Sequence, residues 1–133
     1  MAKRIIAIIL VIMVLGGVVF LTLQSPQQTM KLSEAVRHWI GYKGDPLAFR
    51  SDVHLFEYFV VGLVCVVFAW AFGWKLWIGA AIAAGFGLLD EVIKIFLPTR
   101  EFGAVDLVKD FIGVGVAFGI VSLIWMIRGR KGI

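Results

Sequence analysis

Apolar residues fill four long runs of the chain, separated by turn residues and charges. The runs cover residues 5–23, 53–72, 76–97 and 106–127. A helix needs about 20 apolar residues to cross the hydrocarbon core of a bilayer, so each run is long enough to be a transmembrane helix. The pattern predicts an all-α membrane protein, a four-helix transmembrane bundle formed by a single domain of residues 1–133.

The first run follows two basic residues, Lys3 and Arg4, as the apolar part of a secretory signal peptide does. It is longer than the ~7–15 apolar residues of a signal peptide, and no clear small-residue cleavage site follows it. We therefore expect this segment to be retained as a membrane anchor.

Composition supports the membrane assignment. Of the 133 residues, 61% are hydrophobic and only 17% are charged, whereas soluble domains are about 25% charged. The single Cys65 lies inside an apolar run, which excludes a disulfide framework or a thiol metal cluster. The sequence has no phosphate-binding or nucleic-acid-binding motif, so the expected partner is the lipid bilayer and not nucleic acid.

Basic residues flank one end of the four predicted helices. With four spans, this side carries Lys3, Arg4, Lys75, Arg128, Arg130 and Lys131. No Asp or Glu falls there, and short basic flanks favour the cytoplasm. We predict a multi-pass protein of the cell membrane, with both termini cytoplasmic and the acidic side facing outward.

The predicted outer loop, residues 24–52, contains the signals of a further helix. Ser25 is a candidate N-cap, and Pro26 occupies the first helical position. Gly41 is a natural stop. Apolar residues repeat with helical spacing at Leu32, Ala35, Val36, Trp39 and Ile40. We expect an amphipathic interfacial helix on the outer membrane surface, which acts as an anchor, lid or spacer.

Ionisable residues gather at the outer ends of the last three runs. They are His54, Glu57 and Tyr58 on the second run, Asp90, Glu91 and Lys94 on the third, Asp106 and Asp110 on the fourth, and Arg100 in the loop between the last two. Charged side chains within a membrane normally face a bundle interior or a wet cavity. The sequence therefore predicts one polar pocket, open to the outside, in which these residues bind a ligand.

Small residues indicate close helix packing. Gly79, Ala83 and Gly87 form a stripe at four-residue spacing on the third run, and Gly115 and Gly119 form a G-x-x-x-G on the fourth. Both patterns are typical of membrane helices in close contact. The inner halves of the runs hold no Asp, Glu, Lys, Arg or His, which argues against an ion relay across the membrane and so against a transporter.

Two segments, "HLFEYFVVGLV" from His54 and "DEVIKIFLPTREFGAVDLVKDFIGVGVAFG" from Asp90, resemble the VanZ-like family of bacterial membrane proteins. The family pattern joins a His and a Glu-Tyr pair to a later acidic pair, a Pro-x-Arg loop and two acids before a Gly. The chain departs from it at Lys94, usually Gln, and at Thr99, usually Gly. The resemblance implies a cell-envelope protein related to resistance against the lipoglycopeptide teicoplanin, with no established reaction.

The excess of acids over bases in the predicted pocket leaves its chemistry open. The carboxyl groups could stay protonated and act as general acids, hold a divalent cation or accept a cationic group. They could instead form a structural ion-pair network that orients the helices. One His among scattered carboxylates is a weak metal signature, so no metal and no cofactor is predicted.

Two functions remain open from the sequence. In the first, the pocket binds a lipid-linked, peptidoglycan-related or lipoglycopeptide group without changing it. In the second, the protein is a small membrane hydrolase or transferase acting on such a group. Its acid–base candidates are then His54, Glu91 and Asp110, with Arg100 holding an anion. The sequence separates neither these two functions nor the oligomeric states.

Overall fold

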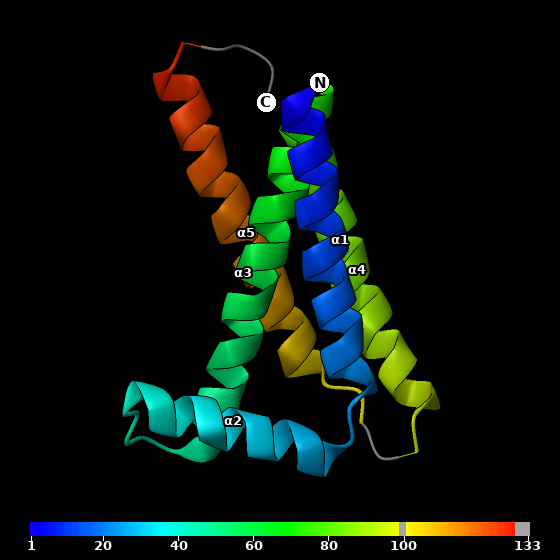
Figure 1. Cartoon of the computed structure of the whole chain (residues 1–133), viewed down its shortest axis with the longest axis vertical. Helices are drawn as coiled ribbons and strands as arrows, with labels where there is room; N and C mark the ends of the chain where they lie inside the picture. The colour runs from blue at the N-terminus through cyan, green and yellow to red at the C-terminus, as the bar shows by residue number, and fades with distance from the viewer. Residues whose placement is uncertain (99–100, 130–133) are drawn as a thin grey trace.

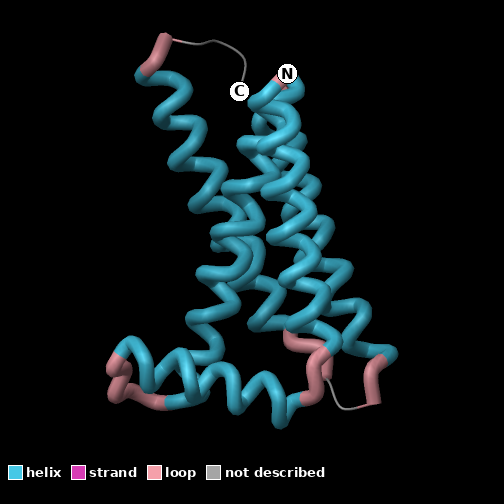
Figure 2. Tube along the Cα trace, in the orientation of Figure 1, coloured by secondary structure: helices cyan, strands magenta, loops and turns pink. Residues whose placement is uncertain are grey.

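The fold is all-helical in the computed structural model, which describes residues 1–98 and 101–129. The helices are α1 (Ala2–Leu23), α2 (Pro26–Ile40), α3 (Pro46–Phe72), α4 (Leu76–Phe96) and α5 (Ala104–Ile127). No strand occurs in these two ranges, and loops are confined to short connections (Figure 2). The predicted all-α class is confirmed.

Within the described residues, four helices are long and apolar enough to cross a membrane. They are α1, the part of α3 from Asp52–Phe72, α4 and α5. They run alternately up and down, so that α1 begins and α5 ends at the same end of the bundle (Figure 1). The 22 residues of α1 rise by about 33 Å at ~1.5 Å per residue, which matches the ~30 Å hydrocarbon core. The prediction of a multi-pass membrane protein is confirmed.

The remaining helix, α2, lies across the other end of the bundle (Figure 1). Its first turn forms a capping box: the Gln28 backbone N–H donates to the Ser25 hydroxyl at 3.3 Å, and the Ser25 N–H donates to the Gln28 side chain at 3.1 Å. Gly41 follows the helix with φ 70°, a left-handed conformation that favours glycine. Both predicted ends of this helix are confirmed.

The next helix, α3, begins at Pro46, before the apolar run predicted from residue 53. The loop that separates it from α2 is therefore short. Phe49, in the first turns of α3, is buried and packs on the ring of Tyr42 at 5.0 Å between centroids. This extension carries α3 beyond its apolar span towards α2.

Glycines let α4 and α5 approach α3, which also contacts α1. A Cβ at Gly79 of α4 would lie 2.6 Å from the Val66 Cα. A Cβ at Gly113 of α5 would lie 2.6 Å from the Leu55 carbonyl oxygen. Neither position has room for a side chain, so both contacts are backbone-to-backbone packing of the kind that small residues permit.

The two predicted small-residue patterns differ in outcome. Gly79, Ala83 and Gly87 are all buried, so the stripe on α4 faces the bundle as expected. Gly115 and Gly119 are exposed, and nothing lies within 4 Å of a Cβ added at either. The expectation that the G-x-x-x-G packs inside the bundle is wrong for the described chain, because α5 turns its Gly113 face to α3.

Aromatic rings and basic side chains meet at the end of the bundle where α1 begins. Lys3 lies over the Trp70 ring at 5.5 Å, and Arg4 lies over the Phe72 ring at 5.4 Å. Trp70 also meets Trp125 edge-on at 6.4 Å between centroids. Such amphipathic rings are typical of the level at which a membrane protein meets the headgroups.

Candidate functional site

Buried and half-buried polar side chains meet at the end of the bundle that α2 covers. They are His54 of α3, Asp90, Glu91 and Lys94 of α4, and Asp110 of α5. All five belong to the predicted site, and three different helices supply them. The structure brings these five residues together.

His54 and Asp110 form the link between α3 and α5. The His54 Nδ1 lies 3.1 Å from the Asp110 Oδ1. Asp110 is 0% exposed, and its Oδ2 has no hydrogen-bond partner among the described residues. The pair forms because Gly113, one turn further along α5, lets this helix approach the α3 backbone at Leu55.

Lys94 pairs with two carboxylates of its own helix. Its Nζ bonds to Glu91 Oε1 and lies 3.5 Å from Asp90 Oδ2. The three residues are three and four positions apart, so they share one face of α4. Glu91 is 0% exposed, and its Oε2 accepts the backbone N–H of Gly103 at 2.9 Å. Glu91 therefore connects the last turns of α4 to the start of α5.

Thr22 of α1 joins the same cluster, although sequence reasoning did not select it. Its hydroxyl hydrogen-bonds to Asp90 Oδ1 and lies 2.9 Å from the carbonyl oxygen of Val18, one turn earlier. A hydroxyl near the end of an otherwise apolar run was the signal that could have identified it. The backbone N–H of Gly103 was also missed, because a backbone donor has no sequence signature.

Three of these side chains could hold a metal ion. His54, Glu91 and Asp110 each offer one ligand atom, and these atoms all lie within 4.8 Å of one another. The same three residues are the acid–base candidates predicted from the sequence, and the structure places them side by side at the junction of α3, α4 and α5.

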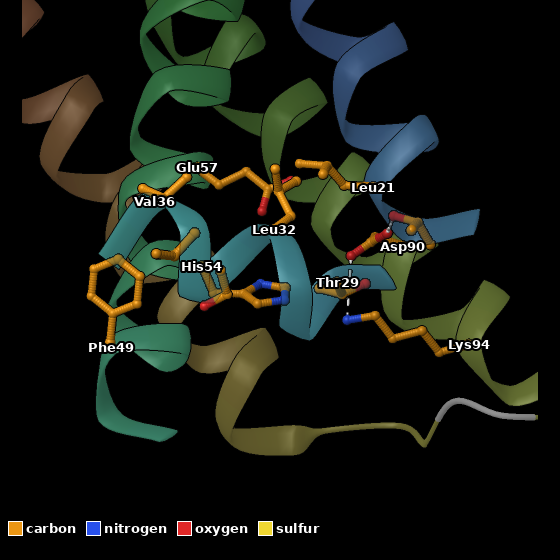
Figure 3. Close-up of a pocket in the computed structure, with 12 residues that line it drawn as sticks. Leu21, Thr29, Leu32, Val36, Phe49, His54, Glu57, Asp90 and Lys94 are labelled. Carbon is orange, nitrogen blue, oxygen red and sulfur yellow. Dashed lines mark hydrogen bonds and ion pairs between the residues drawn. The ribbon is translucent and has the colours of Figure 1, made fainter. Parts of the chain in front are cut away.

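A cavity of about 260 Å³ opens between α2 and the bundle beside this cluster (Figure 3). Its apolar lining consists of Leu21, Leu32, Val36, Phe49 and Val53, and its polar lining of Thr22, Thr29, Ser33, His54, Glu57, Asp90 and Lys94. Figure 3 shows Phe49 to one side of the His54 ring, with Asp90 and Lys94 to the other. The cavity therefore combines an apolar lining with polar side chains on both sides of His54.

The remaining predicted site residues differ in position. Glu57 lines the cavity. Tyr58 is fully buried outside the cavity lining, where its hydroxyl donates to the Phe86 carbonyl oxygen at 3.4 Å and its ring lies parallel to His54. Asp106 is half-buried in the first turn of α5, with no ion pair to the cluster among the described residues. Arg100 lies outside the described residues, so its place in the predicted pocket stays a prediction.

Comparison of the chain with protein-family models, with curated proteins and with solved structures gives no match. Its class follows from the fold: a multi-pass membrane protein with four candidate spans, which buries ionisable side chains at one end of the bundle.

Proposed function

We propose that the protein is a VanZ-like integral membrane protein of the bacterial cell envelope, and that its cavity binds an amphiphilic envelope ligand. One observation carries this proposal: the cavity between α2 and the bundle joins an apolar wall to a buried polar cluster. Ligand sites are typically apolar concavities with a few converging polar groups. A ligand with a lipid part and a polar part fits both surfaces.

Lipid-linked, peptidoglycan-related and lipoglycopeptide groups are the ligand class that fits this lining. The lipid part would contact Leu32 and Val36 of α2 and Phe49 of α3. The polar part would reach Lys94 and Glu57, which offer a cation and an acid in the same cavity. The sequence resemblance to the VanZ-like family favours the same class, because that family is related to resistance against a lipoglycopeptide.

The cavity faces the outside in this proposal. The basic residues Lys3 and Arg4 at the opposite end favour the cytoplasm, so α2 lies on the outer membrane surface. Trp39 of α2 is 86% exposed, as expected for a ring that enters the headgroup layer. The apolar residues of α2 then serve two purposes, since Leu32 and Val36 cover the cavity while Trp39 anchors the helix in lipid.

A second candidate function is hydrolysis or group transfer on such a ligand, and the His54–Asp110 pair favours it. A carboxylate that holds the Nδ1–H of an imidazole leaves Nε2 as the proton acceptor, which is the arrangement of a general base. His54 also lines the cavity, so a bound ligand can reach it. In this function Arg100 would hold an anionic group.

The binding proposal is tested by filling the cavity. The purified protein is reconstituted in lipid nanodiscs and titrated with teicoplanin and with a glycopeptide that lacks the acyl chain. We expect the acylated molecule to bind more tightly, and Val36→Trp to weaken that binding at least about tenfold, or ~1.4 kcal/mol. Val92→Trp, on an exposed face of α4 outside the cavity lining, is the matched control.

Two outcomes contradict this proposal. One is equal binding of the acylated and non-acylated molecules, and the other is an equal effect of the two Trp substitutions.

The catalytic candidate is tested on the same samples with a lipid-linked peptidoglycan precursor as substrate. His54→Gln should then abolish product formation while ligand binding stays within a factor of about three, a ~0.65 kcal/mol difference.

A further inference from the structure

The geometry points to a divalent transition-metal site formed by His54, Glu91 and Asp110. The three helices α3, α4 and α5 each contribute one of these residues, at the place where they meet. This site does not depend on the proposed cavity ligand, because the positions of these three side chains alone define it.

Distance and burial both suit a metal ion. One ligand atom from each of the three residues lies within 4.8 Å of the others. Two ligand atoms of a tetrahedral Zn²⁺ at ~2.0–2.2 Å lie about 3.3–3.6 Å apart, so the most widely separated pair has to close by no more than about 1.5 Å. Glu91 and Asp110 are fully buried, and His54 is half-buried.

The second observation is the buried oxygen of Asp110 that has no donor. Its Oδ1 faces His54, whereas its Oδ2 has no hydrogen-bond partner among the described residues. Oδ2 lies on the side of α4, since a Cβ at Gly87 would be 3.6 Å from it. Gly87 is one turn before Glu91, so this oxygen points towards the helix that supplies the second carboxylate. Buried polar atoms without a partner are rare, and a bound ion is one explanation of them.

Lys94 does not supply the missing charge at Asp110. Its Nζ is engaged with Glu91 Oε1 and Asp90 Oδ2. The described residues of the cluster therefore include three carboxylates, those of Asp90, Glu91 and Asp110, and one lysine to balance their charge. Each carboxylate oxygen has two lone pairs, so Glu91 can contact Lys94 and an ion together. The Gly103 N–H on Glu91 Oε2 orients the carboxylate, as supporting hydrogen bonds around metal ligands do.

The donor set selects the class of ion. An imidazole nitrogen with two carboxylates suits Zn²⁺, Mn²⁺ or Co²⁺, whereas Mg²⁺ and Ca²⁺ favour oxygen-only sites. Three protein ligands leave a tetrahedral ion with one open position. His54 also lines the cavity under α2, so that position can be reached from there.

Metal content gives the first test. The full chain is purified in detergent, treated with a chelator, equilibrated with Zn²⁺ and desalted before mass-spectrometric metal analysis. We expect about one Zn²⁺ per chain, and a loss of about tenfold or more in bound metal for His54→Gln, Glu91→Gln and Asp110→Asn. The controls His38→Gln, an exposed histidine of α2, and Glu57→Gln, a cavity acid outside the triad, should keep the wild-type content.

A gain of signal tests the site without relying on loss. His54→Cys places a thiolate beside Glu91 and Asp110, and Co²⁺ bound there should show a thiolate-to-metal charge-transfer band. His38→Cys should show none, and Cys65, which is buried in the bundle, is present in both variants. Wild-type protein without stoichiometric Zn²⁺, triad variants that keep it, or a His54→Cys protein without the band each overturn the metal site. Teicoplanin binding that persists in the chelated protein would leave the proposed function standing when the metal site fails.

Discussion

Thr22 in α1 hydrogen-bonds to Asp90 in α4, 68 residues away along the chain. The first helix is apolar over the rest of its membrane-spanning length, so this hydroxyl is its polar connection to the buried cluster. This hydrogen bond constrains both the rotation of α1 about its own axis and its depth beside α4. The bond forms only when Thr22 points towards α4 at the depth of Asp90. α1 therefore belongs to the site and is more than an anchor.

Removing this hydroxyl should loosen α1. We expect Thr22→Val, which keeps the shape of the side chain, to cost about 1.5–3 kcal/mol, the range for a hydrogen bond to a charged group. Thr22→Ser keeps the donor and should cost less. Thermal unfolding in detergent measures both. A double-mutant cycle with Asp90→Asn checks the cause, and additive effects of the two changes would show that the pair does not interact.

Two carboxylates of the site should respond differently to neutralisation. Glu91→Gln leaves Lys94 with only Asp90 in a fully buried place, and we expect a loss of about 3–5 kcal/mol, as for a broken buried ion pair. Glu57→Gln removes a cavity acid that has no ion pair among the described residues, so the melting temperature should hold while ligand binding falls.

Melting temperature and teicoplanin binding, measured on the same preparations, separate these effects. If both variants lose stability in parallel with teicoplanin binding, the result would indicate that the cluster is a structural ion-pair network. Asp110→Asn extends the comparison to the third helix.

The glycine contacts predict which positions of α5 tolerate a side chain. Gly113→Val places a branched side chain against the α3 backbone at Leu55, and we expect destabilisation of about 1–3 kcal/mol or more from overpacking. Gly115→Val, two residues further along the same helix, points into open space and is the matched control. Folded yield and melting temperature in detergent measure the difference, and equal losses would contradict the packing of α5 on α3.

The proposed orientation predicts opposite labelling of two engineered cysteines. In a Cys65→Ala background, Gln27→Cys in α2 should react with an impermeant thiol reagent added to intact cells, because α2 lies outside. Lys75→Cys, before α4, should react only after the cells are opened. Both positions are exposed, so reactivity reports the side of the membrane. Labelling of position 75 from outside would place the cavity on the cytoplasmic side.

Local signals in the sequence predicted much of this fold. Ser25 and Gly41 mark the ends of α2 because capping and left-handed turns depend on only a few neighbouring residues. The level of the site was also predictable, since His54, Glu91 and Asp110 are costly in lipid and must meet in one place. Their mutual distances were not, because they depend on how closely α5 approaches α3 at Gly113.

Other features depend on tertiary packing, which the local sequence pattern does not predict. Gly115 and Gly119 have the spacing of a packing motif but face outward, because a helix surrounded by lipid shows no polar stripe to reveal its inner side. The covering of the cavity by Leu32 and Val36 depends on the direction in which α2 leaves α1, which is a tertiary property. A metal site was not predicted, since one histidine with carboxylates on separate helices has no sequence spacing to identify it.

The intrahelical pairing of Lys94 has a consequence for how the protein is made. A growing chain delivers its helices to the membrane one after another, so α4 arrives before α5 exists to share the cost of its acids. An uncompensated charge opposes insertion by about 2.5–3.5 kcal/mol at the centre of a helix, and by less near the helix end, where Asp90 and Glu91 lie. Lys94 lies one turn from Asp90 and Glu91 on the same face, so α4 neutralises one of its own two negative charges without any partner. Lys94 thus makes α4 easier to insert, which would let a newly synthesised chain hold its buried acids in the bilayer until Gly103 and α5 arrive.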